Sequence, residues 1–154
     1  MRIYMKVGGI MEKDSCRFCG LANKLIPCNI VFEDENISCF LDIDPINKGH
    51  VLIVPKRHYV ELVDVDGDTC NSISVASKII YEAINEIYKP DGISIMQNGG
   101  IFNDVGHYHI HVFPRYKGDG FGWTYPKDDA VLDNYLTDTK ERFTNCISEI
   151  RPSR

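Results

Sequence analysis

The chain has 154 residues, of which 44% are hydrophobic and 25% are charged, and its formal net charge is -5. This size and composition suffice for one compact domain with a buried core. The negative charge argues against a broad nucleic-acid-binding surface, which needs a basic face. The longest apolar runs, such as Val51 to Val54, are far shorter than the roughly twenty residues that cross a bilayer. We therefore expect a cytoplasmic protein with no membrane and no nucleic-acid partner.

The beginning of the chain carries no strong motif. It lacks the continuous apolar stretch and the small-residue cleavage site of a secretion signal. We expect residues 1–13 to form a flexible leader and residues 14–154 to form a single domain.

Cys16 and Cys19 follow at the spacing of a zinc knuckle, in which two thiolates bind an ion and a distant pair of ligands completes the tetrahedron. The alternatives are a thiol pair without metal and a redox motif, although the βαβ context of thioredoxin-like proteins is missing. The spacing favours zinc. We expect the remaining cysteines, Cys28, Cys39, Cys70 and Cys146, to be small buried apolar residues.

Apolar runs bounded by turn residues predict about five strands. The strands span residues 30–32, 37–41, 50–55, 93–96 and 108–113. Apolar residues at three- and four-residue steps predict one long amphipathic helix from about 68 to 88, and mixed helical spacing predicts a second helix within 128–150. Successive strands with one long helix between them predict an α+β fold with an antiparallel sheet.

Three of the five histidines, His107, His109 and His111, alternate with apolar residues on the last predicted strand. Because successive side chains of a strand point to opposite faces, the three imidazoles are expected to share one face. Imidazole titrates near neutral pH, so such a row can supply a nucleophile, a phosphate-binding cation and a proton donor. Phosphoryl chemistry uses all three of these roles.

This strand has two alternative interpretations. The histidines could lie on a solvent-exposed strand face without a function, as a single histidine often does, but three in register argue against this. His-x-His pairs are also common metal ligands in hydrolases, and direct ligation by the triplet is therefore an alternative. Such sites usually recruit nearby carboxylates, whereas the nearest one, Asp104, lies in the preceding loop.

The run from His107 to Phe113 resembles the signature of the histidine triad (HIT) family, and Pro114 and Arg115 continue the match. The segments 40–45 and 48–58 also look like the strand-turn-strand around that family's nucleotide pocket. The resemblance covers roughly residues 14–116. It implies an enzyme that binds a nucleotide across the triad strand and forms a nucleotidyl-histidine intermediate, which water then hydrolyses.

The resemblance also implies residue roles. His109 would be the nucleophile that attacks the α-phosphate, and His111 would contact the phosphate. Asp42 would contact the ribose hydroxyls, and His50 and Asn98 would line the pocket. Covalent catalysis of this kind replaces one difficult displacement by two easier ones.

The loop before the triad departs from the family pattern. Family members commonly have Gln and then Ser or Thr where this chain has Asn103 and Asp104. Asn103 can still donate to a phosphate oxygen, whereas an ionised Asp104 would repel one unless it points away or acts as an acid. Capping of the loop by the two side chains is an equally good interpretation.

Zinc-containing relatives resemble this chain in joining the cysteine pair to a histidine after the third strand and to the first triad histidine. These positions are His58 and His107, which gives a structural zinc bound by Cys16, Cys19, His58 and His107. The resemblance further implies a homodimer in which the long helix and a sheet edge meet their symmetry mates.

The substrate implied is a small nucleotide. We rank a nucleoside phosphoramidate or nucleotide conjugate first and a dinucleoside polyphosphate second. A third interpretation, from a different functional class, is a nucleotide-binding regulator or partner-binding protein with little turnover.

Overall fold

The structure is a computed structural model, and it describes residues 16–125 and 135–150. The predicted leader and the first part of the predicted C-terminal helix, residues 128–134, lie outside the described residues. The chain divides into two compact units with a boundary between Phe121 and Gly122. That residues 14–154 form a single domain stays a prediction.

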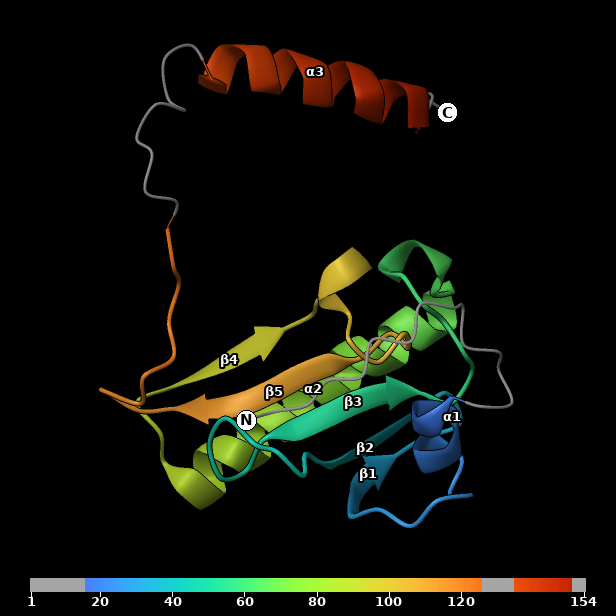
Figure 1. Cartoon of the computed structure of the whole chain (residues 1–154), viewed down its shortest axis with the longest axis vertical. Helices are drawn as coiled ribbons and strands as arrows, with labels where there is room; N and C mark the ends of the chain where they lie inside the picture. The colour runs from blue at the N-terminus through green and yellow to red at the C-terminus, as the bar shows by residue number, and fades with distance from the viewer. Residues whose placement is uncertain (1–15, 126–134, 151–154) are drawn as a thin grey trace. The chain divides into compact units, whose positions relative to one another are not determined.

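Five antiparallel strands form one sheet in the order β1-β2-β3-β5-β4, as Figure 1 shows. The strands are β1 (Ile30–Glu33), β2 (Ile37–Leu41), β3 (Val51–Pro55), β4 (Gly92–Met96) and β5 (Ile110–Arg115). With the helices that cover the sheet, this arrangement confirms the predicted α+β fold and its five-stranded antiparallel sheet. Strand β5, which carries His111 and directly follows His107 and His109, lies between β3 and β4 and is therefore supported on both sides.

Helices cover the two faces of the sheet. In Figure 1, α2 (Gly67–Tyr88) lies behind the sheet and the short α1 (Arg17–Ala22) lies in front of β2 and β3. Two 3-10 turns, η2 (Leu62–Asp64) and η3 (Gly100–Phe102), lie in the connections before α2 and before β5. In the described part of the chain, no helix is long and apolar enough to cross a membrane.

The alternation of side chains along the strands builds two separate apolar clusters. Odd-numbered residues of β2 and β3 join Val112 and the buried face of α2 in the larger cluster. Even-numbered residues join Ala22 of α1 in the smaller one, which contains Phe40, Leu52 and Val54. The even side of β3 is paired with the histidine side of β5, since Leu52 lies opposite His111. The sheet therefore has a packing face and a histidine-bearing face.

Helix α2 begins at a strong cap. The side chain of its N-cap residue, Asp66, accepts a hydrogen bond from the backbone N–H of Thr69 at 2.9 Å and another from the Tyr59 hydroxyl. These two bonds, the one from Tyr59 first, lower the pKa of Asp66 to about 2. The helix ends at Lys89, which adopts the left-handed conformation. Both ends agree with the predicted helix to within one residue.

The second unit contributes α3 (Tyr135–Ile150). Its apolar side chains follow one stripe at helical spacing, and they are exposed within the unit. They are Leu136, Phe143, Ile147 and Ile150. The helix lies within the predicted range 128–150.

Some predicted boundaries and burial states were wrong. Strand β5 begins two residues later than predicted, because the N–H of Tyr108 donates to the carbonyl of Tyr59 rather than to a neighbouring strand. Helix α1 was not predicted, since six residues are too few to show a period. Among the four remaining cysteines, Cys39 is buried, but Cys70 and Cys146 are exposed.

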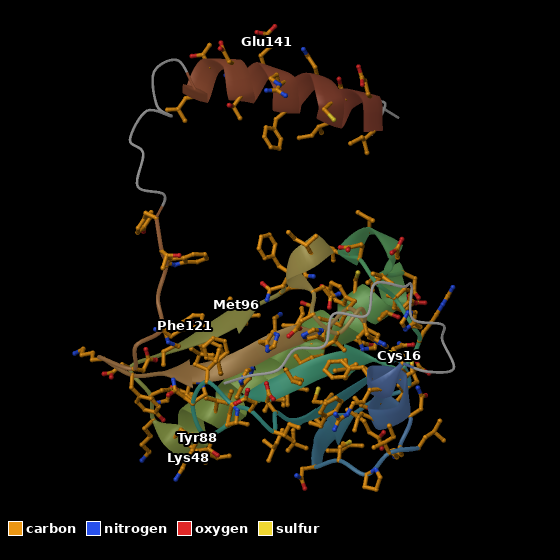
Figure 2. The ribbon with its side chains drawn as sticks, in the orientation of Figure 1. Cys16, Lys48, Tyr88, Met96, Phe121 and Glu141 are labelled. Atoms are coloured by element: carbon orange, nitrogen blue, oxygen red, sulfur yellow. The ribbon has the colours of Figure 1, made fainter. Side chains whose placement is uncertain are left out.

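A glycine shapes the turn that leads into β3. Gly49 has a φ of 92°, and a Cβ atom placed there would lie 2.4 Å from Cε2 of Tyr88. Tyr88 and the neighbouring Lys48 lie at the same edge of the molecule in Figure 2. The turn is closed by the N–H of His50, which donates to the carbonyl of Asn47 at 3.1 Å. Only glycine meets both demands without strain.

We predict that Gly49→Ala lowers the free energy of unfolding by about 2 kcal/mol, because it combines a disfavoured backbone conformation with a steric clash. Urea unfolding followed by circular dichroism measures this. The matched control is Gly67→Ala at the first residue of α2, where an added Cβ meets nothing within 4 Å. That control should be neutral or stabilising by up to about 1 kcal/mol. Equal midpoints for the two variants would contradict the prediction.

Candidate active site and metal centre

His109 is held in one orientation by the backbone. Its Nδ1 lies 2.7 Å from the carbonyl oxygen of His107, so Nδ1 carries the proton and donates it. In the neutral form of this ring the lone pair is therefore on Nε2. The ring packs edge-on against Phe18, with centroids 5.0 Å apart, and against His111, with centroids 4.7 Å apart. The backbone bond and the two ring contacts thus fix the orientation of the ring.

His111 is oriented by a second histidine. Nε2 of His50 lies 2.9 Å from Nδ1 of His111, and the backbone N–H of Ile46 donates to Nδ1 of His50 at 3.2 Å. Because Nδ1 of His50 accepts this bond, its proton is on Nε2 and is donated to His111. A neutral His111 then carries its own proton on Nε2, where it can be donated to a ligand.

Burial keeps both of these rings neutral. It lowers the pKa of His111 to about 4, and the neighbouring His109 and His50 lower it further. Burial also lowers the pKa of His50, although Asp42 opposes the shift from 3.4 Å. The pair therefore offers hydrogen-bond donors at neutral pH, without a positive charge.

These histidines open into a cavity of about 510 Å³. It is lined by polar side chains from several elements, namely Arg17, Asp42, Asp44, His50, Asn98, Asp104, His109 and His111. A second cavity of about 430 Å³ is mostly apolar and is lined by Phe18, Leu21, Phe40 and Leu52. Arg17, Asp42 and Asp104 line both. The two cavities therefore adjoin, one polar and one apolar.

The structure brings together all but one of the residues predicted to bind substrate or act in catalysis. Asp42, His50, Asn98, His109 and His111 line the polar cavity. Asn103 is absent from the linings of both cavities. Its Nδ2 donates to the carbonyl of Val60 at 3.2 Å, and its Oδ1 accepts from the N–H of Gly106 at 3.1 Å. The Asn103 side chain therefore caps the loop, as the capping interpretation predicted for this residue, whereas Asp104 makes no hydrogen bond among the described residues.

The predicted metal ligands also converge. One donor atom from each of Cys16, Cys19, His58 and His107 lies within 4.8 Å of every other. Nδ1 of His107 is 3.4 Å from the sulfur of Cys16, and Nδ1 of His58 is 3.3 Å from that of Cys19. Cys16 is at the start of α1 in Figure 2, whereas His107 immediately precedes β5.

The donor set fits a tetrahedral zinc ion. Zn–S bonds of about 2.3 Å and Zn–N bonds of about 2.0 Å require ligand S···N distances of about 3.5 Å. Nε2 of His107 donates a hydrogen bond to the carbonyl of Pro55 at 3.0 Å, so the lone pair of the ring is on Nδ1, which faces the sulfurs. Burial lowers the pKa of His107 to about 4, so the ring is neutral, as a metal ligand must be.

The three triad histidines divide among different tasks. His107 belongs to the cysteine cluster, and His111 belongs to a separate cluster with Asp42 and His50. Among the described residues, no cluster of potential ligands includes His109. This division does not match direct ligation of one ion by the whole triplet.

Sequence reasoning missed the walls of the cavities. Phe18 lies between the two cysteines, and the interpretation of this segment as a zinc site gave no indication that Phe18 lines both cavities. Phe121, which follows β5, also lines the polar cavity, and its ring packs on Phe113 with centroids 5.2 Å apart. Figure 2 labels it together with Met96, another lining residue. No local pattern distinguishes an aromatic wall from an aromatic core residue.

A carboxylate anchors the segment that carries Phe121. Asp119 accepts from Nε of Arg115 at 2.6 Å and from the N–H groups of Tyr116 and Phe121, both at 3.1 Å. The first of these, the bond from Arg115, is also the main reason why the pKa of Asp119 is held well below its usual range. Arg115 in turn lies over the Phe121 ring, 4.6 Å from its centroid.

The HIT domain family matches residues 23–118 of the sequence. The chain belongs to the HIT family. It is similar to an uncharacterised HIT-like protein of Methanocaldococcus jannaschii, with 42% identity over 111 residues, covering 68% of this chain and 82% of that one. It is also 34% identical over 118 residues to an adenosine 5'-monophosphoramidase of Schizosaccharomyces pombe, covering 73% of this chain and 86% of the relative.

Solved structures of HIT proteins share the fold. A HIT family member from Bacillus subtilis superimposes with a TM-score of 0.77 at 30% identity and covers 91% of this chain and 99% of its own. A zinc-bound histidine triad protein from Mycobacterium smegmatis superimposes with a TM-score of 0.65 at 32% identity, covering 86% and 98%. The family thus includes a protein named as a nucleotide phosphoramidase and one solved with zinc.

Proposed function

We propose that this HIT protein hydrolyses nucleoside phosphoramidates or related nucleotide conjugates through a nucleotidyl intermediate on His109. The observation that carries the proposal is the orientation of His109, which lines the polar cavity: its Nδ1 donates to the His107 carbonyl, so a neutral ring has its lone pair on Nε2. The name of the S. pombe relative supports the substrate class.

The two cavities divide the substrate between them. The apolar cavity, with Phe18 and Phe40, suits a nucleobase, and Asp42 at the junction suits the ribose hydroxyls. The phosphate then lies against His109 and His111. The Nε2 proton of His111 can be donated to a phosphate oxygen, which stabilises charge as the displacement proceeds.

The chemistry is two successive displacements at the α-phosphorus. Nε2 of His109 attacks, the bond to the leaving amine breaks, and the amine keeps the electron pair and takes up a proton from solvent. Water then attacks the same phosphorus, loses a proton, and releases the nucleoside monophosphate and neutral His109. A phosphorus–nitrogen bond is formed and broken at one imidazole, so each step needs little reorganisation of the site.

We further propose that a zinc ion bound by Cys16, Cys19, His58 and His107 has a structural role. The support is the fit of the four donors and the zinc-bound structure of the M. smegmatis relative. When bound, the ion would supply a crosslink between α1 and the start of the triad strand, with no open coordination position for chemistry.

Intact-protein mass spectrometry tests the proposed function. The protein is mixed with adenosine 5'-phosphoramidate, quenched in acid and weighed, and the adduct is then mapped by peptide sequencing. An added adenylyl mass on His109 is the expected result. Turnover without any adduct on His109 would contradict the covalent route, and binding of nucleotide without turnover would favour a regulatory protein instead. Faster turnover of diadenosine tetraphosphate than of any phosphoramidate would favour the polyphosphate substrate class.

We also propose a homodimer formed through β4. This strand is at the edge of the sheet, and Ile95 on it is half exposed. Between β4 and α2 lies a hollow of about 560 Å³, lined by apolar residues that include Ile73, Tyr81 and Ile110. A sheet edge that no strand of the described residues covers, beside an apolar hollow, suits a second copy that extends the sheet.

We predict that the protein sediments with twice the mass of one chain and that Ile95→Lys sediments as a monomer, because a charge at the edge opposes both pairing and burial. The matched control is Val31→Lys on β1, the opposite edge of the sheet, where the side chain is similarly exposed. Dissociation of both variants, or of neither, would contradict this interface.

A further inference from the structure

The loop before the triad strand directs a carboxylate, rather than a neutral donor, into the site. The side chain of Asn103 is committed to the carbonyl of Val60 and the N–H of Gly106. Gly106 has a φ of 67°, which turns the chain into His107. Between these fixed points, Asp104 borders both the polar and the apolar cavity. The loop geometry thus determines which side chain of the pair faces the substrate.

The Asp104 carboxylate meets little opposing charge. It is exposed, and among the described residues it takes part in no hydrogen bond or ion pair. Among the described residues that line the polar cavity, two further side chains are carboxylates, Asp42 and Asp44, and one is cationic, Arg17. Burial keeps His50 and His111 neutral and so removes two other sources of positive charge. This cavity is therefore poor in positive charge for a phosphate-binding site.

From this charge distribution we infer that Asp104 determines specificity by selecting the charge of the leaving group. The inference rests on the proposed function and refines its substrate class to nucleoside phosphoramidates of amines that carry a second, positively charged group. Asp104 lies where the two cavities meet, next to the proposed seat of the α-phosphate. A group attached to that phosphorus is within reach of its field, whereas an anionic tail such as a polyphosphate would be repelled.

Coulomb's law gives the size of the effect. At a separation of about 6 Å and an effective dielectric constant of about 40 to 80, one unit charge on the leaving group changes the rate by about 3- to 10-fold. A cationic and an anionic leaving group of equal size should therefore differ by about 10- to 100-fold. Salt should compress the difference, because the Debye length is about 10 Å at 0.1 M ionic strength.

The test uses three adenosine 5'-phosphoramidates of nearly equal length, made from 1,4-diaminobutane, butylamine and 4-aminobutyrate. Their free ends are positive, neutral and negative. The ratio of kcat/KM values among them is measured at low and high salt for the natural protein, Asp104→Asn, Asp104→Glu and Asp68→Asn. Asp68 is an exposed carboxylate in the first turn of α2 and does not line either substrate cavity, so its variant controls for net charge.

The natural protein, Asp104→Glu and Asp68→Asn should all prefer the diamine, then butylamine, then aminobutyrate. In Asp104→Asn the kcat/KM values of the three substrates should differ by no more than about 3-fold, which is the smallest effect expected from one unit charge. An unchanged range in Asp104→Asn, or no charge preference in the natural protein, would overturn the inference while leaving the proposed function intact. Absence of turnover and of any His109 adduct with all three substrates would overturn the proposed function, and the inference with it.

Discussion

Replacing His109 with alanine should lower the turnover of adenosine 5'-phosphoramidate on the order of 10⁴-fold or more, with little change in nucleotide affinity. The imidazole is the proposed attacking group, and removal of a nucleophile abolishes the covalent route. His109 does not line the apolar cavity, and the hydrogen bond between His50 and His111 does not involve its side chain. Single-turnover kinetics and calorimetric titration with AMP separate the two effects.

The control for this experiment is Tyr108→Phe. Tyr108 is adjacent in sequence and equally buried, but it belongs to the apolar cluster on the α2 face of the sheet. This variant should retain most of the activity. His109→Gln serves as a second variant in case a cavity left by alanine disturbs the packing against Phe18. Residual turnover within tenfold of the natural protein in both His109 variants would exclude His109 as the nucleophile.

Removal of the proposed zinc ion, or replacement of a proposed ligand by Cys16→Ser, should lower the thermal midpoint by about 10 °C or more, since several kcal/mol of metal-binding free energy would be coupled to folding. The physical reason lies in the position of the ligands. Cys16 and Cys19 are at the start of α1, a six-residue helix with no side-chain bond at its N-cap. The crosslink to His107 would therefore add to the packing of Phe18 in holding the first turn of this helix.

Scanning calorimetry and metal analysis by mass spectrometry measure this effect, with Cys146→Ser as the matched control because Cys146 is an exposed cysteine on α3. A structural ion predicts that activity is lost slowly on chelation, together with the fold. Rapid loss of activity with an unchanged midpoint would instead indicate a metal in the chemistry. A Cys16→Ser variant as stable as the control, in a protein that contains no zinc, would refute the proposal.

Much of the fold was predictable because period and turn residues are local signals. The two-residue alternation of β5 and the three- and four-residue steps of α2 set the elements and their faces. Strand ends were less predictable, since they depend on which neighbour accepts a hydrogen bond, as the Tyr108–Tyr59 bond at 2.7 Å illustrates. Helix α1 is too short to have a period, and its position follows from the contacts of Cys16 and Phe18.

The candidate site divides in the same way. Chemically distinctive residues such as Cys16 and His107 were brought together by the resemblance of their motifs to a known family, and the structure brings their side chains into contact. The separation of Asn103 from Asp104 was not predictable from their types. It depends on Val60, a residue distant in sequence, whose carbonyl accepts a hydrogen bond from the Asn103 side chain. The Asp104 side chain is then the one that lines the cavity.

Because the sheet has two different faces, adjacent residues of one strand are subject to different constraints. On β5, Val112 lies in the packed cluster against α2, while His111 faces the polar cavity. Changes at positions of the first kind alter how much folded protein a cell maintains, whereas changes at positions of the second kind alter what that protein does. New substrate preferences can therefore evolve on one face of this sheet without first weakening the other.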